Sequence, residues 1–192
     1  MFVLIVGLVV FLGVHSTRIV AEDWRTARIA RLGENRWKSI YSVVTLVGFG
    51  LIVWGYALAR RDPTVLWYAP VWSRHLASLL VLAAFILVAA AYVPRNPIKA
   101  AIGHPMFAGV KVWALGHLLS NGTVADLLLF GGFLVWAALG FRSARARDRK
   151  AQVRHAPGTV GGTLATLAAG VVGWAVFAFL LHRPLIGVAP LG

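Results

Sequence analysis

The sequence predicts an all-α, polytopic membrane bundle of about six transmembrane helices. Of the 192 residues, 59% are hydrophobic and only 13% are charged, whereas soluble domains carry roughly 25% charged residues. The charged residues also leave four long uncharged windows, at 2–17, 39–59, 76–94 and 155–182. About 20 consecutive apolar residues cross the hydrocarbon core of a bilayer. This composition excludes a water-soluble enzyme, so any chemistry must use side chains within or between the helices.

The uncharged windows locate four of the helices. We expect them near 2–20, 39–59, 76–93 and 160–181. The apolar runs are continuous and lack the alternation of membrane β-strands, so they indicate helices and not a barrel. The first run has no basic residues before it and no small-residue cleavage site after it, so we expect a retained helix and not a removed signal peptide.

Two further helices are expected between Lys99 and Arg142. This stretch is too long for one crossing, and Ser120-Asn121-Gly122 interrupts it with a composition typical of a turn. The expected helices lie near 104–120 and 124–141. Since no linker divides the chain, we expect a single domain over residues 1–192.

Basic residues predict the orientation of the bundle. The loops after the first, third and fifth expected helices hold 14 of the 19 Lys and Arg residues. The loops on the opposite side hold only Arg60, Arg61, Arg74 and Arg183. By the positive-inside rule, the basic loops are expected in the cytoplasm of a bacterial inner membrane, with both termini in the periplasm. The net charge of +13 is then explained by topology and anionic lipid, and not by nucleic acid.

Small residues recur at intervals of four in the last expected helix, at Gly161, Ala165, Ala169 and Gly173. Small side chains let helix backbones approach closely in membranes. We therefore expect this face to pack against another helix.

Polar side chains inside the spans are the candidates for function, because placing each in lipid costs a few kcal/mol. The candidates are His15, His104, Lys111, His117, Asn121, Asp126 and His182. Neutral imidazole is the commonest metal ligand among side chains, and the chain has no cysteine, which excludes thiolate ligands, iron–sulfur clusters and disulfides.

Several of these side chains also have structural interpretations. A buried His15 could hydrogen-bond to a neighbouring helix. Lys111 can extend to the headgroups and Asp126 can reach water near the outer end of its helix. His182 could be an interfacial histidine or could close an outer pocket.

Helix geometry separates His104 from His117. They are 13 residues apart, which places them about 220° apart around one helix, so one ligand cannot bind both. His15 and His117 belong to different, oppositely directed helices, and the expected boundaries place them roughly 12 Å apart in height. Their side chains lean toward each other, because each leans toward the N-terminus of its own helix. This geometry permits, but does not require, that His15 and His117 bind one iron.

Four segments resemble the NnrU family of bacterial membrane proteins. They are Gly13-Val14-His15-Ser16, Gly103-His104-Pro105, the run from Trp113 to Gly122, and Leu181-His182-Arg183. The resemblance covers nearly the whole chain and implies a link to denitrification and nitric oxide metabolism. The family is in turn similar to plant 15-cis-zeta-carotene isomerase, a membrane enzyme whose haem b is held by two histidines.

That similarity implies that His15 and His117 match the axial ligands of haem b, and that His104 is a further matching histidine. His104, Lys111, Asn121 and His182 are then candidates for an additional site. The implied ligands are nitric oxide or a hydrophobic small molecule, and the implied chemistry is redox, nitric-oxide-related or isomerase chemistry. The isomerase's redox ligand switching is linked to a cysteine, which this chain lacks.

Two other functions stay open at the level of sequence. One is a non-enzymatic membrane accessory protein whose histidines only hold the bundle together. The other is a methyltransferase, because the segment from Gly103 to Gly109 resembles the Arg-His-Pro-x-Tyr-x-Gly element of membrane enzymes that methylate prenylcysteine or phospholipids. Here Gly103 and Phe107 stand where that element has arginine and tyrosine, and no acidic pair follows.

Overall fold

The computed structural model describes residues 1–190, so the last two residues of the expected domain lie outside the described part. The elements in chain order are α1 (Phe2–Val20), α2 (Glu22–Leu32), α3 (Glu34–Ala59), α4 (Val71–Tyr92), α5 (Pro97–Ile102), α6 (Pro105–Ser120), α7 (Val124–Lys150), α8 (Val160–Ala175), the π-helix η1 (Val176–Leu181) and α9 (His182–Ile186). Within the described residues, the only β-pairing is an isolated bridge between Val65 and Thr123.

The all-α polytopic prediction is confirmed. Five helices are long and apolar enough to cross a membrane: α1, α3, α4, α7 and the continuous helical run from Val160 to Ile186. The sixth expected span is α6, which has 16 residues and packs against α4 and α7. It is short because Pro105 opens it and Asn121, with an extended backbone, ends it.

Two short helices lie where loops were expected. The α2 helix begins with Glu22 and Asp23, which suit the positive end of a helix dipole. The α5 helix begins at Pro97, and the Asn96 side chain accepts a hydrogen bond from the Lys99 backbone N–H. Hydropathy windows of membrane length do not detect either helix because both are short and α2 is rich in charge.

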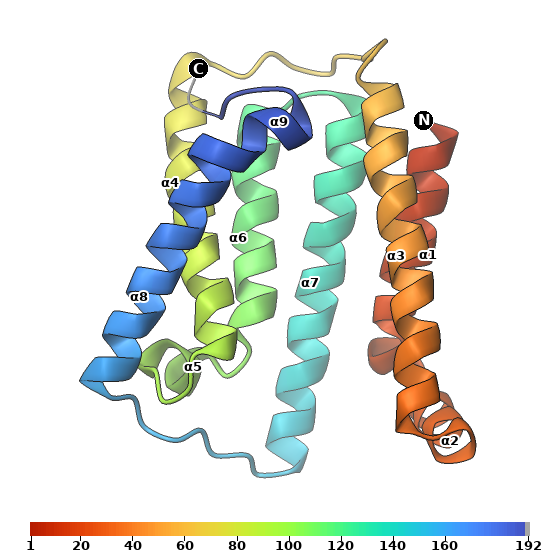
Figure 1. Ribbon diagram of the computed structural model, residues 1–192, viewed down its shortest axis with the longest axis vertical. Coiled ribbons are helices and arrows are strands. Elements are labelled where there is room, and N and C mark those ends of the chain that lie inside the picture. Colours follow the sequence, from red (N-terminus) through yellow and green to blue (C-terminus); the bar gives the residue numbers. More distant parts are fainter. Residues whose placement is uncertain (191–192) are drawn as a thin grey trace.

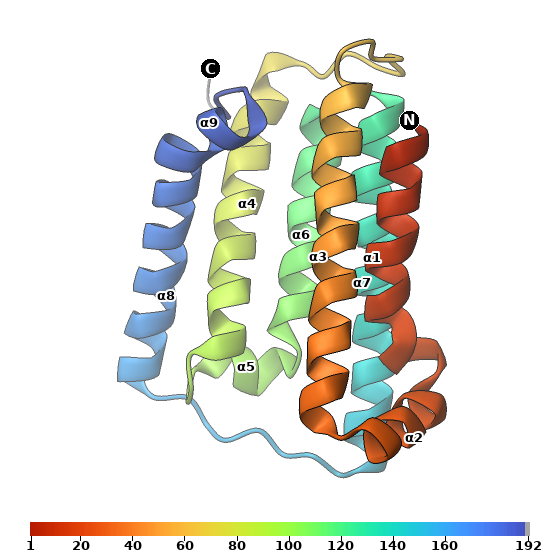
Figure 2. The same ribbon diagram turned by 45° about the vertical axis from the view of Figure 1, so that its right-hand side comes forward.

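Helix α7 joins two groups of helices (Figures 1 and 2). It packs against α1, which pairs with α3, and against α6, which pairs with α4; α8 packs on the far side of α4. At one end, residues 60–70 cross between the groups, where the Leu66 N–H donates to the Gly122 carbonyl at 2.7 Å. Leu4, Leu8, Ile52, Ala114, Leu129 and Phe130 are among the buried residues of the core that α1, α3, α6 and α7 share.

Glycines bring α1 and α3 into backbone contact. A Cβ added at Gly7 would lie 2.6 Å from the Ile52 nitrogen, and one added at Gly48 would lie 2.8 Å from the Phe11 nitrogen. At Gly55 an added Cβ would lie 2.6 Å from the Leu4 Cα. The position of α1 is therefore set by three close approaches along one face of α3.

The expected close-packing face of α8 was wrong at three of its four positions. Gly161 has open space around it, and Ala165 and Ala169 are exposed, whereas Gly173 does meet the Phe85 ring of α4. The face against α4 instead carries Gly170, where an added Cβ would lie 2.6 Å from the Ile86 Cα, and Thr166, which is fully buried. The Thr166 hydroxyl donates to the Gly162 carbonyl within its own helix at 2.7 Å, so this polar side chain can be buried in the contact with α4. A search for small residues alone does not find this face.

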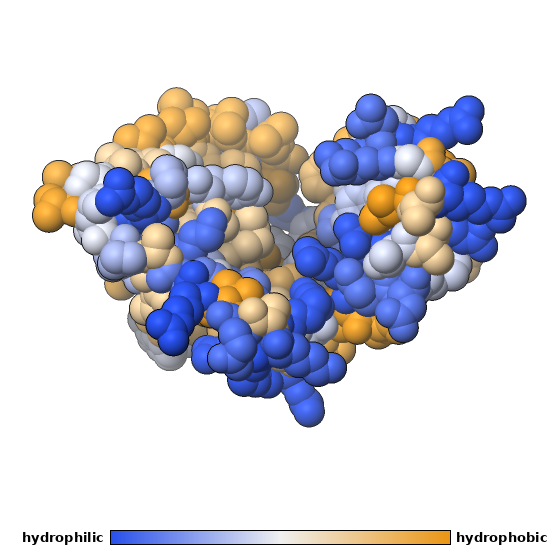
Figure 3. All heavy atoms as spheres, turned by 90° about the horizontal axis from the view of Figure 1, so that it is seen from below, coloured by the Kyte–Doolittle hydropathy of each residue, from blue (hydrophilic) through white to orange (hydrophobic). Residues whose placement is uncertain are grey.

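The two ends of the bundle differ in charge. The N-terminus and α9 are at the end opposite α2 and α5 (Figure 1). From the α2 and α5 end, hydrophilic residues cover much of the surface, and a groove separates two lobes (Figure 3). Along the sides, large apolar residues such as Val9, Leu46 and Leu79 are each more than 60% exposed. Such exposure suits lipid contact, and the chain is a multi-pass membrane protein.

Candidate functional site

His15 lies on α1 where α1, α3 and α7 meet. Its Nδ1–H donates to the Phe11 carbonyl one turn earlier at 2.7 Å. Since a carbonyl only accepts, the proton sits on Nδ1 and the Nε2 lone pair remains available. The ring stacks on Phe11 with 4.3 Å between centroids and meets Tyr41 and Trp136 edge-on, at 5.3 and 6.0 Å.

His117, in the last turn of α6, repeats this arrangement. Its Nδ1–H donates to the Trp113 carbonyl at 2.9 Å, again one turn earlier. The ring stacks on Phe130 of α7 at 4.5 Å and lies 5.0 Å from the Trp113 ring. Both histidines therefore present Nε2 from an aromatic, half-buried environment.

A row of aromatic residues on α7 connects the two histidines. Phe130, Phe133 and Trp136 follow one another at intervals of three, which places them along neighbouring turns. His117 contacts the first of them and His15 contacts the last. Six residues of helix rise by roughly 9 Å. The two imidazoles therefore meet α7 at different levels, with His15 nearer the basic end, as the helix registers predict.

Phe133, in the middle of this row, bridges α1 and α6. Its ring lies 5.6 Å from the Phe11 ring and 5.6 Å from the Trp113 ring. Aromatic rings thus form a continuous path from one histidine to the other. A buried donor next to this path has no acceptor within the described residues, namely the indole N–H of Trp136.

His104 and Lys111 lie away from His15 and His117. His104 is the N-cap of α6, and its Nε2 lies 2.8 Å from Asp148 Oδ2 near the end of α7. The Lys111 ammonium lies over the Phe141 ring of α7 at 4.1 Å from its centroid. The structure therefore does not bring these two residues together with His15 or His117.

Asn121 and His182 make local contacts at the other end of the bundle. The Asn121 side-chain amide donates to the His117 carbonyl at 2.8 Å and so helps to close the last turn of α6. The His182 Nδ1–H donates to the Val188 carbonyl at 2.7 Å, at the start of α9. Both contacts stabilise the ends of helices.

The expectation that Asp126 reaches water was wrong. Asp126 is 4% exposed. Its carboxylate accepts hydrogen bonds from the Thr123 N–H and hydroxyl, at 2.9 and 2.7 Å, and from the Tyr56 hydroxyl at 2.5 Å. It therefore completes a capping box at the start of α7 and ties α7 to α3.

Sequence reasoning missed the α7 aromatic row and the partners of Asp126 and Asp148. The interval of three between Phe130, Phe133 and Trp136 is visible in the sequence, but an aromatic stripe is ordinary in an apolar helix. Asp126 pairs with Tyr56, and Asp148 pairs with His104. The partners are far apart in the chain, so no local sequence pattern predicts either pair.

A family comparison identifies the chain. The model of the family described as NnrU protein matches residues 3–190. The chain belongs to the NnrU family. No curated protein and no solved structure matches it.

Proposed function

We propose that this NnrU protein is a membrane haem protein, with His15 and His117 as the axial ligand candidates for haem b, acting in nitric-oxide- or denitrification-related metabolism. One observation carries the proposal. Both imidazoles direct Nδ1–H to a backbone carbonyl and keep Nε2 available in an aromatic setting. Metal-bound histidines usually make such a bond with their second nitrogen, which fixes the ring and its tautomer.

The side chains around the two histidines are aromatic and apolar, as contacts to a haem macrocycle would be. The rings of Phe11, Phe133 and Trp113 provide apolar surfaces between the two helices. The unpaired indole N–H of Trp136 is a donor for a polar edge of such a group, because buried donors are nearly always paired in complete structures. The chain has no cysteine, so imidazole and not thiolate would hold a haem iron here.

The two histidines meet α7 at different levels, His117 at Phe130 and His15 at Trp136. Either imidazole alone, or both together after a relative shift of α1 and α6, would hold the haem iron.

Bound haem would supply a redox-active iron that binds nitric oxide or acts on a polyene in an isomerase-like reaction. The chain's own residues would exclude water from the iron and orient the imidazoles through the Phe11 and Trp113 carbonyls. A low-dielectric site strengthens such electrostatic contacts.

An absorption spectrum tests the proposal. We expect the full chain, purified in mild detergent with haem supplied, to show a Soret band that His15→Ala or His117→Ala shifts or removes. His104→Ala is the matched control, because His104 lies away from both residues, and it should leave the band unchanged. A colourless preparation refutes haem binding. A band that survives both single substitutions and their combination refutes the ligand assignment.

Non-enzymatic packing is the second candidate function, and the stacking of His15 on Phe11 and of His117 on Phe130 favours it. It predicts that both alanine substitutions lower thermal stability in a protein that never binds haem. A methyltransferase predicts saturable S-adenosylmethionine binding that His104→Ala weakens. In the structure, however, His104 and Pro105 serve to start α6.

The proposed location is a bacterial inner membrane, with the basic loops in the cytoplasm and both chain ends in the periplasm. The separation of the N-terminus and α9 from α2 and α5 supports this orientation (Figure 1). A C-terminal alkaline phosphatase fusion should be active, and a C-terminal green fluorescent protein fusion should be dark. The reverse pattern refutes the orientation.

A further inference from the structure

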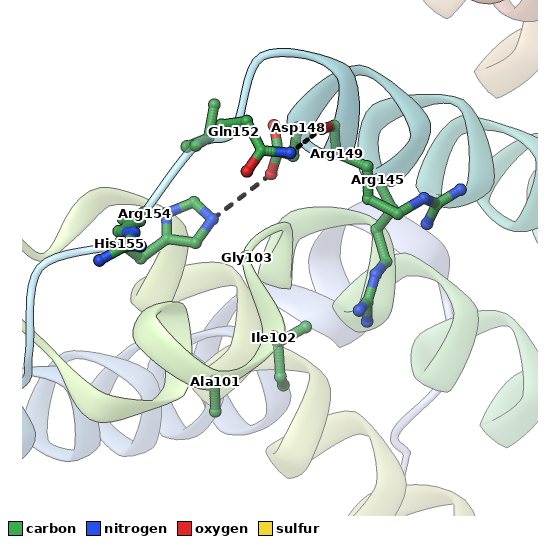
Figure 4. A pocket seen from close by; sticks show the side chains of 10 residues that line it. Ala101, Ile102, Gly103, Arg145, Asp148, Arg149, Gln152, Arg154 and His155 are labelled. Atoms are coloured by element: carbon green, nitrogen blue, oxygen red, sulfur yellow. Dashed lines mark hydrogen bonds and ion pairs between the residues drawn. The ribbon is translucent and has the colours of Figure 1, made fainter.

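A pocket of about 430 Å³ lies at the basic end of the bundle, away from the two axial ligand candidates. It is formed by the end of α5, the end of α7 and the segment that follows α7 (Figure 4). Its lining includes Ala101, Ile102, Arg145, Arg149, Val153 and Arg154. It therefore combines three guanidinium groups with an apolar wall.

The arginines of this pocket have no acidic partner. Arg145, Arg149 and Arg154 are all exposed, and within residues 1–190 none of them forms an ion pair with a carboxylate. The one carboxylate that lines the pocket, Asp148, is engaged by histidines: its Oδ2 lies 2.8 Å from His104 Nε2 and 3.4 Å from His155 Nε2. The pocket lining therefore carries three guanidinium charges against one carboxylate, which leaves it net positive.

The apolar wall lies beside this charge. Ala101 and Ile102 end α5, directly before the apolar helix α6, and Val153 is 47% exposed on the opposite segment. Exposed apolar and cationic side chains meet here at the level where the apolar spans give way to the basic loops. A ligand that satisfies both must carry an anionic group next to hydrocarbon.

We propose that this pocket binds the phosphate headgroup of an anionic phospholipid. Guanidinium groups bind phosphate oxygens through paired hydrogen bonds, which a point charge cannot match. Basic pockets between helices at the cytoplasmic surface are suited to lipid phosphates. A soluble phosphate would use the same arginines, but it would leave Ala101, Ile102 and Val153 exposed to water.

The test compares two arginine triplets on the same end of the bundle. The pocket variant carries Arg145→Gln, Arg149→Gln and Arg154→Gln. The matched control carries Arg28→Gln, Arg31→Gln and Arg36→Gln, three exposed arginines of α2 and α3 outside the pocket. Native mass spectrometry of the full chain in detergent measures binding of phosphatidylglycerol, with phosphatidylcholine as the neutral lipid.

We expect phosphatidylglycerol to bind in preference to phosphatidylcholine, and the pocket variant to weaken its affinity by about tenfold or more. The control variant should change it by less than about twofold. Equal losses in both variants, or equal binding of the two lipids, overturn the proposal, because general charge would then explain retention. Displacement of the lipid by millimolar inorganic phosphate also overturns it in favour of a soluble phosphate ligand.

Two further measurements guard against misfolding. Detergent gel filtration and thermal unfolding should match between the two triple variants. If the pocket triplet unfolds, Arg149→Lys and Arg149→Gln replace it: both remove the guanidinium, and lysine keeps the charge. The proposal then requires the glutamine variant to lose more affinity than the lysine variant. Equal affinity in both and in the unaltered chain overturns it.

Discussion

Replacing Gly55 by alanine should destabilise the bundle through the contact of α1 with α3. The added Cβ would lie 2.6 Å from the Leu4 Cα, whereas an ordinary contact begins at 3.4 Å. Since the obstacle is backbone, no side chain can rotate away, and α1 must shift by roughly 1 Å. Overpacking of this kind costs about 1–3 kcal/mol. Gly50→Ala is the matched control because Gly50 lies on the same helix with open space around it.

The control should gain about 0.5–1 kcal/mol from helix propensity, since alanine favours helices over glycine. Because Gly55→Ala gains the same helix propensity, the two variants should differ by the overpacking cost alone, about 1–3 kcal/mol in the free energy of unfolding. Reversible unfolding in mixed detergent micelles, followed by circular dichroism, measures this difference. Because α1 also carries His15, Gly55→Ala should alter the environment of that imidazole as well. Equal stability of the two variants would refute the close approach of α1 and α3.

Three further substitutions test other contacts. Asp126→Ala should lower the free energy of unfolding by about 3 kcal/mol, because it leaves three donors without their acceptor, whereas Tyr56→Phe should lower it by about 1 kcal/mol. Thermal unfolding compares the two variants, and equal losses would contradict the capping-box role of Asp126. Gly170→Ala should lower the melting temperature and Gly161→Ala should not, since only Gly170 meets α4 closely; the opposite order would restore the face predicted from sequence. Lys111→Met should lower the free energy of unfolding by about 1 kcal/mol or less, because it removes the cation–π contact. It should leave any Soret band unchanged, and a spectral shift would place Lys111 at the haem.

The sequence predicted the spans better than the contacts between them. Scarcity of charge located the helices that became α1, α3, α4 and α8, because lipid tolerates few charges over a crossing. The turn composition at residues 120–122 divided the remaining apolar stretch into α6 and α7. The same reasoning overlooked α2 and α5, which are too short for a hydropathy window. It also chose Gly161 over Gly170 on α8, since a repeat of small residues does not say which face meets a neighbour.

For the candidate site, the sequence by itself determined that His15 and His117 are imidazoles in apolar helices of opposite direction, in a chain without cysteine. Only the tertiary structure decided that each ring bonds to its own backbone through Nδ1, that α7 lies between their helices, and that they meet it at different levels. It also buried Asp126 against Tyr56 and joined Asp148 to His104. The physical reason is that hydropathy acts on each helix separately, whereas hydrogen bonds and ring contacts depend on which helices become neighbours and in which register.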